Sequence, residues 1–371
     1  MSPDATTEIC CTNCRRPYPD HGAPYRCPTC GGVFDFDAFP FFDPAQVEPG
    51  QPGIWRYRHT FGLPPDAPAV SLGEGQTPLV WRTLFGKQVG FKLEFANPTG
   101  SYKDRGSAVL LSFLLSRGVS EAVEDSSGNA GASFAAYAAA AGLRGRVFVP
   151  EYASGPKRAQ IEAYGAEVVR ILGSRSQTTE AALRAVEQGA VYASHAYLPQ
   201  GLAGYATLAY ELFEQIGDAP GSVISPAGQG NLLLAIGRGF QGLRRSGRVD
   251  RVPHMLGVQA LACAPLWALQ EYGSAGLAWV GENETLAEGV RVRHPIHGDS
   301  VMRMLSETGG RLAAVDEPDI LPGRAALARL GLYVEPTSAI VWKALESLAA
   351  DLPEPIVVIL TGSGLKALLR S

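Results

Sequence analysis

Three things are scarce in this sequence of 371 residues: long apolar runs, runs of like charge, and cysteine outside the N-terminal region. No apolar stretch approaches the ~18 residues that span a bilayer, so we expect no membrane anchor. Residues 1–6 lack the charged and apolar regions of a secretory signal, which favours a cytoplasmic protein.

Charge is sparse and scattered along the chain. The 32 basic and 36 acidic residues give a formal net charge of −4, and the basic residues form no continuous stretch. A nucleic-acid surface needs clustered basic residues, so we expect no nucleic-acid partner. The apolar fraction of 46% is typical of a globular protein, and the length suffices for two or three domains.

The cysteines gather near the N-terminus, where five of the six precede residue 31. Two Cys-x-x-Cys pairs separated by a short polar segment can place four thiolates around one Zn²⁺ ion. We therefore predict a structural zinc ribbon. Its ligands would be Cys11, Cys14, Cys27 and Cys30.

Three other interpretations of these cysteines stay open. Disulfides would fit the number of thiols, although a reducing cytosol keeps such thiols open. Cys10 directly precedes the first pair, so the ligand register could shift by one residue. One of the pairs could also have a redox role.

The most informative segment is Asn97-Pro98-Thr99-Gly100-Ser101-Tyr102-Lys103-Asp104-Arg105-Gly106, which runs directly into an apolar stretch. This pattern predicts that Lys103 lies near the N-terminus of a helix. The helix dipole disfavours a cation there by roughly 0.3–1 kcal/mol, but it favours an amine that must lose its proton to attack an aldehyde. The position thus favours chemistry, although most lysines are solvated surface charges.

Two further segments, 124–131 and 223–232, each lead from a strand-like run through a Gly-containing turn into an apolar helix. Backbone N–H groups in such turns bind carboxylates or phosphates. We expect an anion site in the first segment and a phosphate site in the second. Taken alone, the second segment is equally compatible with an ordinary tight turn between a strand and a helix.

Together with Thr361-Gly362-Ser363-Gly364-Leu365-Lys366 and Leu72-Gly73-Glu74-Gly75-Gln76-Thr77-Pro78-Leu79, these segments resemble the fold-type II pyridoxal-phosphate enzymes, most closely the threonine synthase family. The resemblance implies a tryptophan synthase β-like α/β fold with two parallel-sheet domains and a small N-terminal zinc ribbon. Strand-like runs at 145–150, 166–171 and 355–360 alternate with Ala- and Leu-rich helical stretches, as such a fold requires.

The expected domains follow from the resemblance and from composition. They are a zinc ribbon at 1–38, a proline-rich connector at 39–70, a large cofactor-binding domain at 71–98 and 206–371, and a small α/β domain at 99–205.

The resemblance also implies roles for single residues. Lys103 would bind the aldehyde of pyridoxal 5′-phosphate and remove the α-proton of the substrate. Asn129 would bind the ring hydroxyl, and Thr361 would face the pyridine nitrogen. The cofactor phosphate would be held by Gly228, Gln229, Gly230, Asn231 and Leu232. The substrate carboxylate would be held by Ser127, Gly128 and Ala130.

Two more segments, Thr285–Gly289 and Glu335–Ala339, resemble stretches near the cofactor in amino acid dehydratases of the same fold type. A basic loop lies between them. It contains Arg291, Arg293, His294 and His297. This loop could meet an anionic substrate group or be a solvated loop.

The resemblance implies an amino acid substrate and a homodimer. The leading expectation is conversion of O-phosphohomoserine to threonine by γ-elimination of phosphate and addition of water at Cβ. The family usually has Ser-Thr-Gly-Asn-Thr where this chain has Ser126-Ser127-Gly128-Asn129-Ala130, so β-elimination or β-replacement on serine- or threonine-like amino acids is the alternative. A non-catalytic scaffold is a third hypothesis, against which the intact Lys103 argues.

Overall fold

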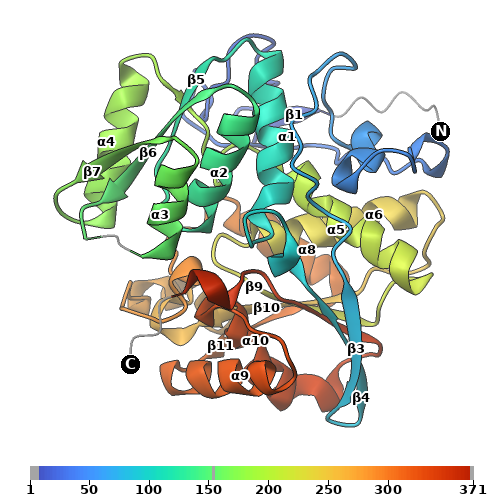
Figure 1. Cartoon of the computed structure of the whole chain (residues 1–371). Coiled ribbons are helices and arrows are strands. Elements are labelled where there is room, and N and C mark those ends of the chain that lie inside the picture. The colour runs from blue at the N-terminus through green and yellow to red at the C-terminus, as the bar shows by residue number, and fades with distance from the viewer. Residues whose placement is uncertain (1–7, 153–154, 368–371) are drawn as a thin grey trace. The chain divides into compact units, whose positions relative to one another are not determined.

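The computed structural model describes residues 8–152 and 155–367. These residues form two compact units (Figure 1). The first unit comprises 8–75 and 97–205, and the second comprises 76–96 and 206–367. The last boundary falls within helix α5 (Gln200–Ile216), which begins in the first unit and ends in the second.

The first unit begins with a small two-stranded ribbon. Strands β1 (Ile9–Cys11) and β2 (Phe34–Phe36) pair antiparallel. Cys11, Cys27 and Phe34 are buried together beneath them and form the ribbon's own small core. The ring of Tyr18 packs edge-on against Phe34 at a centroid distance of 4.6 Å.

The proline-rich stretch that follows has a defined structure. It contains two 3₁₀ helices, η1 (Pro44–Gln46) and η2 (Gly53–Thr60). The side chains of Ile54, Trp55 and Tyr57 are almost fully buried, so the connector has its own apolar anchors. These anchors explain how a stretch without helical or strand periodicity is nevertheless ordered.

Glu74 joins this connector to the rest of the first unit. Its carboxylate is fully buried and accepts hydrogen bonds from Trp55 Nε1 at 3.0 Å and from Tyr137 Oη at 2.7 Å. It also accepts from the backbone of Leu72 at 2.9 Å. Burial, with the nearby charges of Asp104 and Glu74, raises the pKa of Tyr137, so its hydroxyl remains a donor. The buried carboxylate is thereby fully hydrogen-bonded, as a stable buried charge must be.

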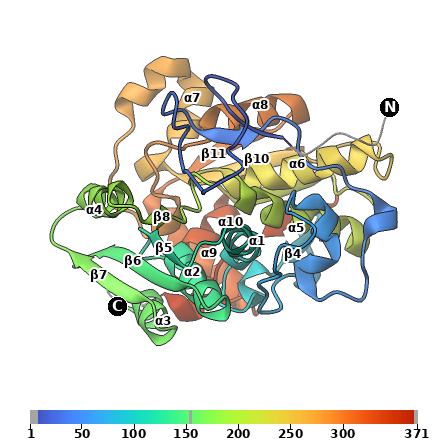
Figure 2. The ribbon, with the colours of Figure 1, turned by 90° about the horizontal axis from the view of Figure 1, so that it is seen from above.

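The main sheet of the first unit has four parallel strands in the order β7-β6-β5-β8. The strands are β5 (Glu121–Glu124), β6 (Arg144–Pro150), β7 (Glu167–Ile171) and β8 (Val191–Tyr192). The helices are α1 (Lys103–Ser116), α2 (Asn129–Ala140), α3 (Pro156–Ala163) and α4 (Arg175–Glu187). Figure 2 shows α4 on one side of the sheet and α2 and α3 on the other, which is the covered parallel sheet that the sequence predicts.

The second unit has a six-stranded sheet in the order β11-β10-β9-β12-β4-β3. Its strands are β3 (Leu79–Leu84), β4 (Lys87–Lys92), β9 (Ser222–Pro226), β10 (His254–Ala260), β11 (Arg311–Val315) and β12 (Ile356–Ile359). Its α-helices, apart from the end of α5, are α6 (Asn231–Arg245), α7 (Pro265–Tyr272), α8 (Gly298–Thr308), α9 (Glu317–Arg329) and α10 (Pro336–Leu348). Its short 3₁₀ helices are η3 (Glu94–Ala96), η4 (Leu261–Cys263), η5 (Gly273–Trp279), η6 (Glu288–Val290), η7 (Ala349–Asp351) and η8 (Gly364–Lys366).

One strand of this sheet departs from the expected all-parallel arrangement. The edge strand β3 runs antiparallel to β4, with which it forms the hairpin at the lower right of Figure 1. The two strands are joined by Phe85 and Gly86, both with positive φ, and a connection this short permits only antiparallel pairing.

Side chains of β10 alternate between the two faces of the sheet. Leu256 and Val258 join the core formed with α10, whereas a Cβ at Gly257 would lie 2.8 Å from Leu233 of α6. Both faces are therefore buried, which explains the continuous apolar character of these strands. Among the residues that the structure describes, no helix has both the length and the apolar character needed to cross a membrane.

Candidate active site

Lys103 is the first residue of α1, as the sequence predicts. Its side chain is half-buried, and its Nζ atom lies 4.7 Å from the ring centroid of Tyr102 and 5.8 Å from that of Tyr205. The two rings also contact each other at 5.2 Å. The faces of such rings attract a nearby ammonium group, so they help to fix where this amine lies.

Asp104 fixes the backbone beside this amine. Its fully buried carboxylate accepts hydrogen bonds from Thr99 N at 2.7 Å and from Thr99 Oγ1 at 2.6 Å, which close the turn before the helix. It also accepts from Ser133 Oγ in α2 at 2.7 Å. The start of α1 is thus tied both to its own turn and to the neighbouring helix.

The predicted anion loop connects β5 to α2. Gly128 is the N-cap of α2, and no side chain caps this helix end. A Cβ at Gly131 would lie 1.8 Å from the carbonyl oxygen of Ser126, so only glycine permits this close turn. The loop residues Ser127, Gly128 and Asn129 are half-buried, and Ala130 is buried. Backbone N–H groups at an uncapped helix N-terminus suit a carboxylate.

An ion pair holds the start of this loop. Asp125 accepts hydrogen bonds from Arg175 Nη1 at 2.9 Å and from Thr179 Oγ1 at 2.7 Å, both in α4. Burial alone would raise the pKa of Asp125, but the Arg175 guanidinium and these hydrogen bonds lower it below its usual value. Asp125 is therefore a charged anchor between the loop and α4.

The predicted phosphate turn lies in the second unit, between β9 and α6. Gly230 has φ +78°, and a Cβ there would lie 2.6 Å from Val301 Cγ2. A Cβ at Gly228 would lie 2.9 Å from the carbonyl oxygen of Gly289. Gln229 accepts a hydrogen bond from Ile296 N at 2.9 Å. The next two residues, Asn231 and Leu232, are buried in the first turn of α6.

No side chain caps α6, so its first N–H groups are suited to bind a phosphate, and a bound phosphate there stays a prediction.

Thr361 lies at the same edge of the sheet as this turn, because β12 and β9 are parallel neighbours and both segments follow their carboxyl ends. Its backbone N–H donates to Ser338 Oγ at 2.7 Å. The side chain is only 3% exposed, and within the described residues Oγ1 has no hydrogen-bond partner. A buried hydroxyl without a hydrogen-bond partner lowers the stability of the fold by about 1–3 kcal/mol, unless a ligand forms the hydrogen bond. The Thr361 hydroxyl is therefore suited to form a hydrogen bond with the ring nitrogen of a ligand.

The two dehydratase-like segments meet near this edge. Gly289 N donates to Thr337 Oγ1 at 3.0 Å, and Glu335 N donates to the carbonyl oxygen of Gly362 at 3.0 Å. The segments therefore lie beside Gly228 and Thr361, and their proximity to a cofactor stays a prediction.

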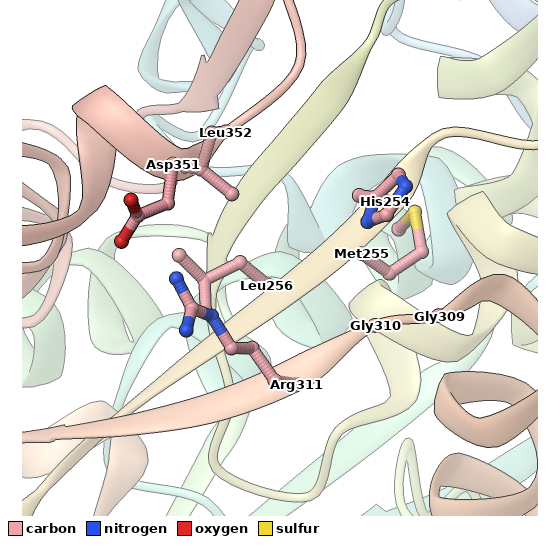
Figure 3. Close-up of a pocket in the computed structure, with 8 residues that line it drawn as sticks. All are labelled: His254, Met255, Leu256, Gly309, Gly310, Arg311, Asp351 and Leu352. Carbon is pink, nitrogen blue, oxygen red and sulfur yellow. The ribbon is translucent and has the colours of Figure 1, made fainter.

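A separate shallow cavity of about 210 Å³ opens at the opposite edge of this sheet (Figure 3). Figure 3 shows Arg311 and Asp351 on one side of the cavity and His254 on the other. His254 and Arg311 begin β10 and β11, whereas Thr361 follows the carboxyl end of β12. The cavity is therefore no part of the candidate site.

The predicted site residues thus form two groups. The first unit joins Lys103 and the Ser127–Ala130 loop through the start of α1 and α2. The second unit brings the Gly228–Leu232 turn and Thr361 to one sheet edge. The roles assigned to these residues stay predictions. Asp104 is not among the residues predicted from the sequence, because its only sequence signal is its position after Lys103.

The N-terminal cysteines form a compact cluster. The Sγ atoms of Cys11, Cys14, Cys27 and Cys30 all lie within 4.8 Å of one another. Cys11 and Cys30 are 3.5 Å apart, and Cys14 and Cys27 are 3.6 Å apart. Tetrahedral zinc with Zn–S bonds of about 2.3 Å separates its sulfur ligands by about 3.8 Å, so the cluster fits a metal ion. Hydrogen bonds from the Gly32 N–H and from neighbouring side chains lower the pKa of Cys30 to about 6. Although a backbone hydrogen bond from Arg16 lowers the pKa of Cys14, burial and the neighbouring thiols raise it to about 11. Cys30 is therefore the thiol of the two that more readily forms the thiolate that metals bind.

Comparison with known proteins identifies the fold and the family of this chain. Residues 70–362 match the sequence family described as pyridoxal-phosphate dependent enzyme. Among solved structures, a T.th. threonine deaminase is similar with 28% identity and a TM-score of 0.64, covering 77% of this chain and 92% of its own. Maize serine racemase shares the fold at 22% identity and a TM-score of 0.68, covering 79% and 89%. The architecture is that of the fold-type II pyridoxal-phosphate enzymes.

Relatives with known names identify the family within this class of enzymes. A threonine synthase of Methanocaldococcus jannaschii is 32% identical over 96% of this chain and 92% of the relative. A threonine synthase of Synechocystis sp. is 32% identical over 84% of this chain and 82% of the relative. The chain belongs to the threonine synthase family of pyridoxal-phosphate-dependent enzymes, and it is a lyase by general kind.

Proposed function

We propose that this protein converts O-phosphohomoserine and water to threonine and phosphate. The bond between Cγ and the phosphate oxygen breaks and Cγ gains a proton. Cβ loses a proton and bonds to the hydroxyl of water, and the remaining proton of the water balances the charge of the released phosphate. One observation carries the proposal: the similarity to a threonine synthase extends over 96% of this chain and 92% of that relative, including the N-terminal region before residue 70.

The chain's residues fit the cofactor that this reaction needs. Bound pyridoxal phosphate supplies an electron sink for negative charge at the α-carbon of an amino acid. Lys103 would bind its aldehyde, the backbone N–H groups of the Gly228–Leu232 turn its phosphate, and Asn129 its ring hydroxyl. The buried hydroxyl of Thr361, which has no partner in the described chain, would meet its ring nitrogen.

A threonine at position 361 also favours elimination reactions over transamination. A neutral hydroxyl holds a ring nitrogen protonated far less strongly than a carboxylate does, because charge-assisted hydrogen bonds are much stronger. Negative charge would therefore remain near the α-carbon, which favours loss of a β or γ substituent over transamination.

Residues of the first unit would bind the substrate carboxylate and transfer the α-proton. The uncapped N-terminus of α2, with Ser127, Gly128 and Ala130, would bind the substrate carboxylate. Lys103 Nζ would take the α-proton and later return it. Asp104 would keep that amine in place through its bonds to Thr99 and Ser133.

The test is to mix the purified, cofactor-loaded protein with O-phosphohomoserine and measure phosphate and threonine. We expect equal amounts of both. Lys103→Ala should lower the rate at least ~100-fold, because a positioned general base contributes about 10²–10⁴-fold. Borohydride reduction followed by peptide mapping should place the cofactor on residue 103. Lys343→Ala, an exposed lysine of α10, is the matched control and should remain active.

One alternative reaction has specific support. Ala130 stands where the family usually has a threonine, and a threonine deaminase is among the similar structures. These features favour β-elimination or β-replacement on serine- or threonine-like amino acids, which needs the same lysine and no chemistry at Cγ. Keto acid formed from serine, together with no phosphate released from O-phosphohomoserine, would replace our proposal by this one.

We also propose that the cysteine cluster holds a structural Zn²⁺ and that the protein is a homodimer. The four closely spaced sulfurs support the first proposal, because closed sulfur sites favour zinc. The second extends the family resemblance, and sedimentation equilibrium of the loaded protein tests it.

A further inference from the structure

The buried Glu124 and the half-buried His195 form an acid–base pair that none of the roles above uses. Glu124 Oε1 lies 3.1 Å from His195 Nδ1, and Glu124 Oε2 accepts from the backbone N–H of His195 at 3.4 Å. The Glu124 side chain is only 1% exposed, and that of His195 is 23% exposed. One carboxylate thus holds both the ring and the backbone of this histidine.

The pair lies at the sheet edge that carries the predicted substrate loop. Glu124 is the last residue of β5, and the Ser126–Ala130 loop begins two residues later. Strand β8 is the parallel neighbour of β5, and Ala193 N donates to the carbonyl oxygen of Val123 at 2.8 Å. His195 follows two residues on. Because parallel strands end at the same edge, His195 and the loop share that edge.

The other polar groups near Glu124 either bond to another residue or stay neutral. Arg175 bonds to the neighbouring Asp125 instead. Burial, the largest cause, together with nearby charges that include Glu124 raises the pKa of Tyr192 and of Tyr205, so both phenols stay neutral. In the described chain, His195 is the hydrogen-bond partner of both Glu124 oxygens.

A buried carboxylate on Nδ1 fixes the tautomer of the imidazole and assigns proton exchange to Nε2, as in other catalytic histidines. The proposed reaction removes protons from the α- and β-carbons, adds one to Cγ and takes one from the attacking water. Lys103 serves the α-carbon, whereas the water that attacks Cβ must lose a proton to another base.

We propose that the Glu124–His195 pair is this base. As the water oxygen bonds to Cβ, the double bond at Cβ opens and its electron pair moves toward the α-carbon. The O–H bond of the water breaks and the proton moves to His195 Nε2, from which solvent later removes it. The inference rests on the proposed function, because it assigns a residue to the water-addition step.

The test uses the loaded enzyme with O-phosphohomoserine and compares three products. His195→Asn keeps a side-chain donor to Glu124 but cannot take a proton. We expect it to release phosphate within a few-fold of the wild-type rate. Threonine per phosphate should fall at least ~10-fold, within the range that a general base contributes. Substrate that has lost phosphate without gaining water would leave by hydrolysis as 2-oxobutyrate and ammonia, which should make up the difference.

Controls separate a chemical role from a structural one. His254→Asn changes an exposed histidine of the second unit and should leave the product ratio unchanged. An unchanged threonine-to-phosphate ratio in His195→Asn, or an equal loss of phosphate and threonine, overturns the inference. A wild-type enzyme that releases no phosphate refutes the proposed function instead, and the assignment of His195 with it.

A second readout needs no activity. In the cofactor-free protein, the ¹⁵N shifts of the His195 imidazole should show the tautomer protonated at Nδ1. The tautomer protonated at Nε2 would contradict the inference.

Discussion

The carboxylate of Asp104 accepts a hydrogen bond of 2.7 Å from the hydroxyl of Ser133. This bond joins the first turn of the helix that carries Lys103 to the helix that begins with Asn129. Two predicted cofactor contacts are therefore held in register by one buried carboxylate rather than by the loops that precede them.

Replacing this carboxylate should disturb both stability and cofactor binding. Asp104→Asn removes the charge that accepts from Thr99 and Ser133, and hydrogen bonds to charged groups contribute about 1.5–3 kcal/mol each. We expect a loss of roughly 2–4 kcal/mol in urea unfolding and a shifted visible spectrum of the bound cofactor. Ser116→Ala, at the other end of α1, is the control and should cost under about 1 kcal/mol. An unchanged spectrum in Asp104→Asn would show that Asp104 does not position Lys103.

Thr361→Val should separate ligand binding from stability. The substitution keeps the shape of the side chain but removes a buried hydroxyl that has no partner in the described chain. We expect the cofactor-free protein to be as stable as wild type or more stable by up to about 1 kcal/mol, whereas the loaded enzyme should lose activity. Thr361→Ser retains the hydroxyl and should restore part of the activity. If Thr361→Val were fully active, the hydroxyl would have no role toward the cofactor.

Metal content should distinguish neighbouring cysteines. Cys14→Ser removes one of the four clustered sulfurs, whereas Cys10→Ser changes a buried cysteine outside the cluster. Atomic emission of purified protein should find one zinc per chain in the wild type and in Cys10→Ser and markedly less in Cys14→Ser. Zinc lost from Cys10→Ser as well would show that Cys10 contributes to the site, and a full zinc content in Cys14→Ser would contradict the predicted ligands.

The Asp125–Arg175 pair should give a stability term that depends on pH. The folded pKa of Asp125 is lowered, so its contribution is present above the unfolded value of about 3.9 and is lost as pH falls below it. Arg175→Gln should cost about 1–2 kcal/mol at pH 7, less than a fully buried pair because Arg175 is 42% exposed. That cost should shrink as pH falls below about 4.

The control for this experiment is Arg170→Gln, which breaks a pair with Glu162 that is exposed on both sides. Urea unfolding across the pH range should find little change in this variant. A cost of Arg175→Gln that stayed constant down to pH 2 would rule out Asp125 as its source.

Local pattern predicts where the helices of the site begin. The three Gly-containing turns predict a helix that begins near Lys103 and helices that follow the 124–131 and 223–232 segments. The observed helices α1, α2 and α6 begin at Lys103, Asn129 and Asn231. Helix starts and strand ends depend on nearby residues, and such signals are readable without tertiary information.

Contacts between distant residues are not readable in this way. Glu124 and His195 are 71 positions apart, and Asp104 and Ser133 are 29 apart. Each pair is brought together by neighbouring strands or helices, and no local pattern specifies which side chains will meet. The alternation of strands and helices favours parallel pairing, so it does not predict the antiparallel direction of β3.

The carboxylate of Glu74 has a consequence for how this protein can be divided. A shortened chain that began after Gly75 would delete Glu74 and remove the acceptor of the hydrogen bond that the buried phenol of Tyr137 donates. The amino-terminal fifth of the polypeptide is therefore no detachable appendage, since the interior of the adjoining helical layer depends on it.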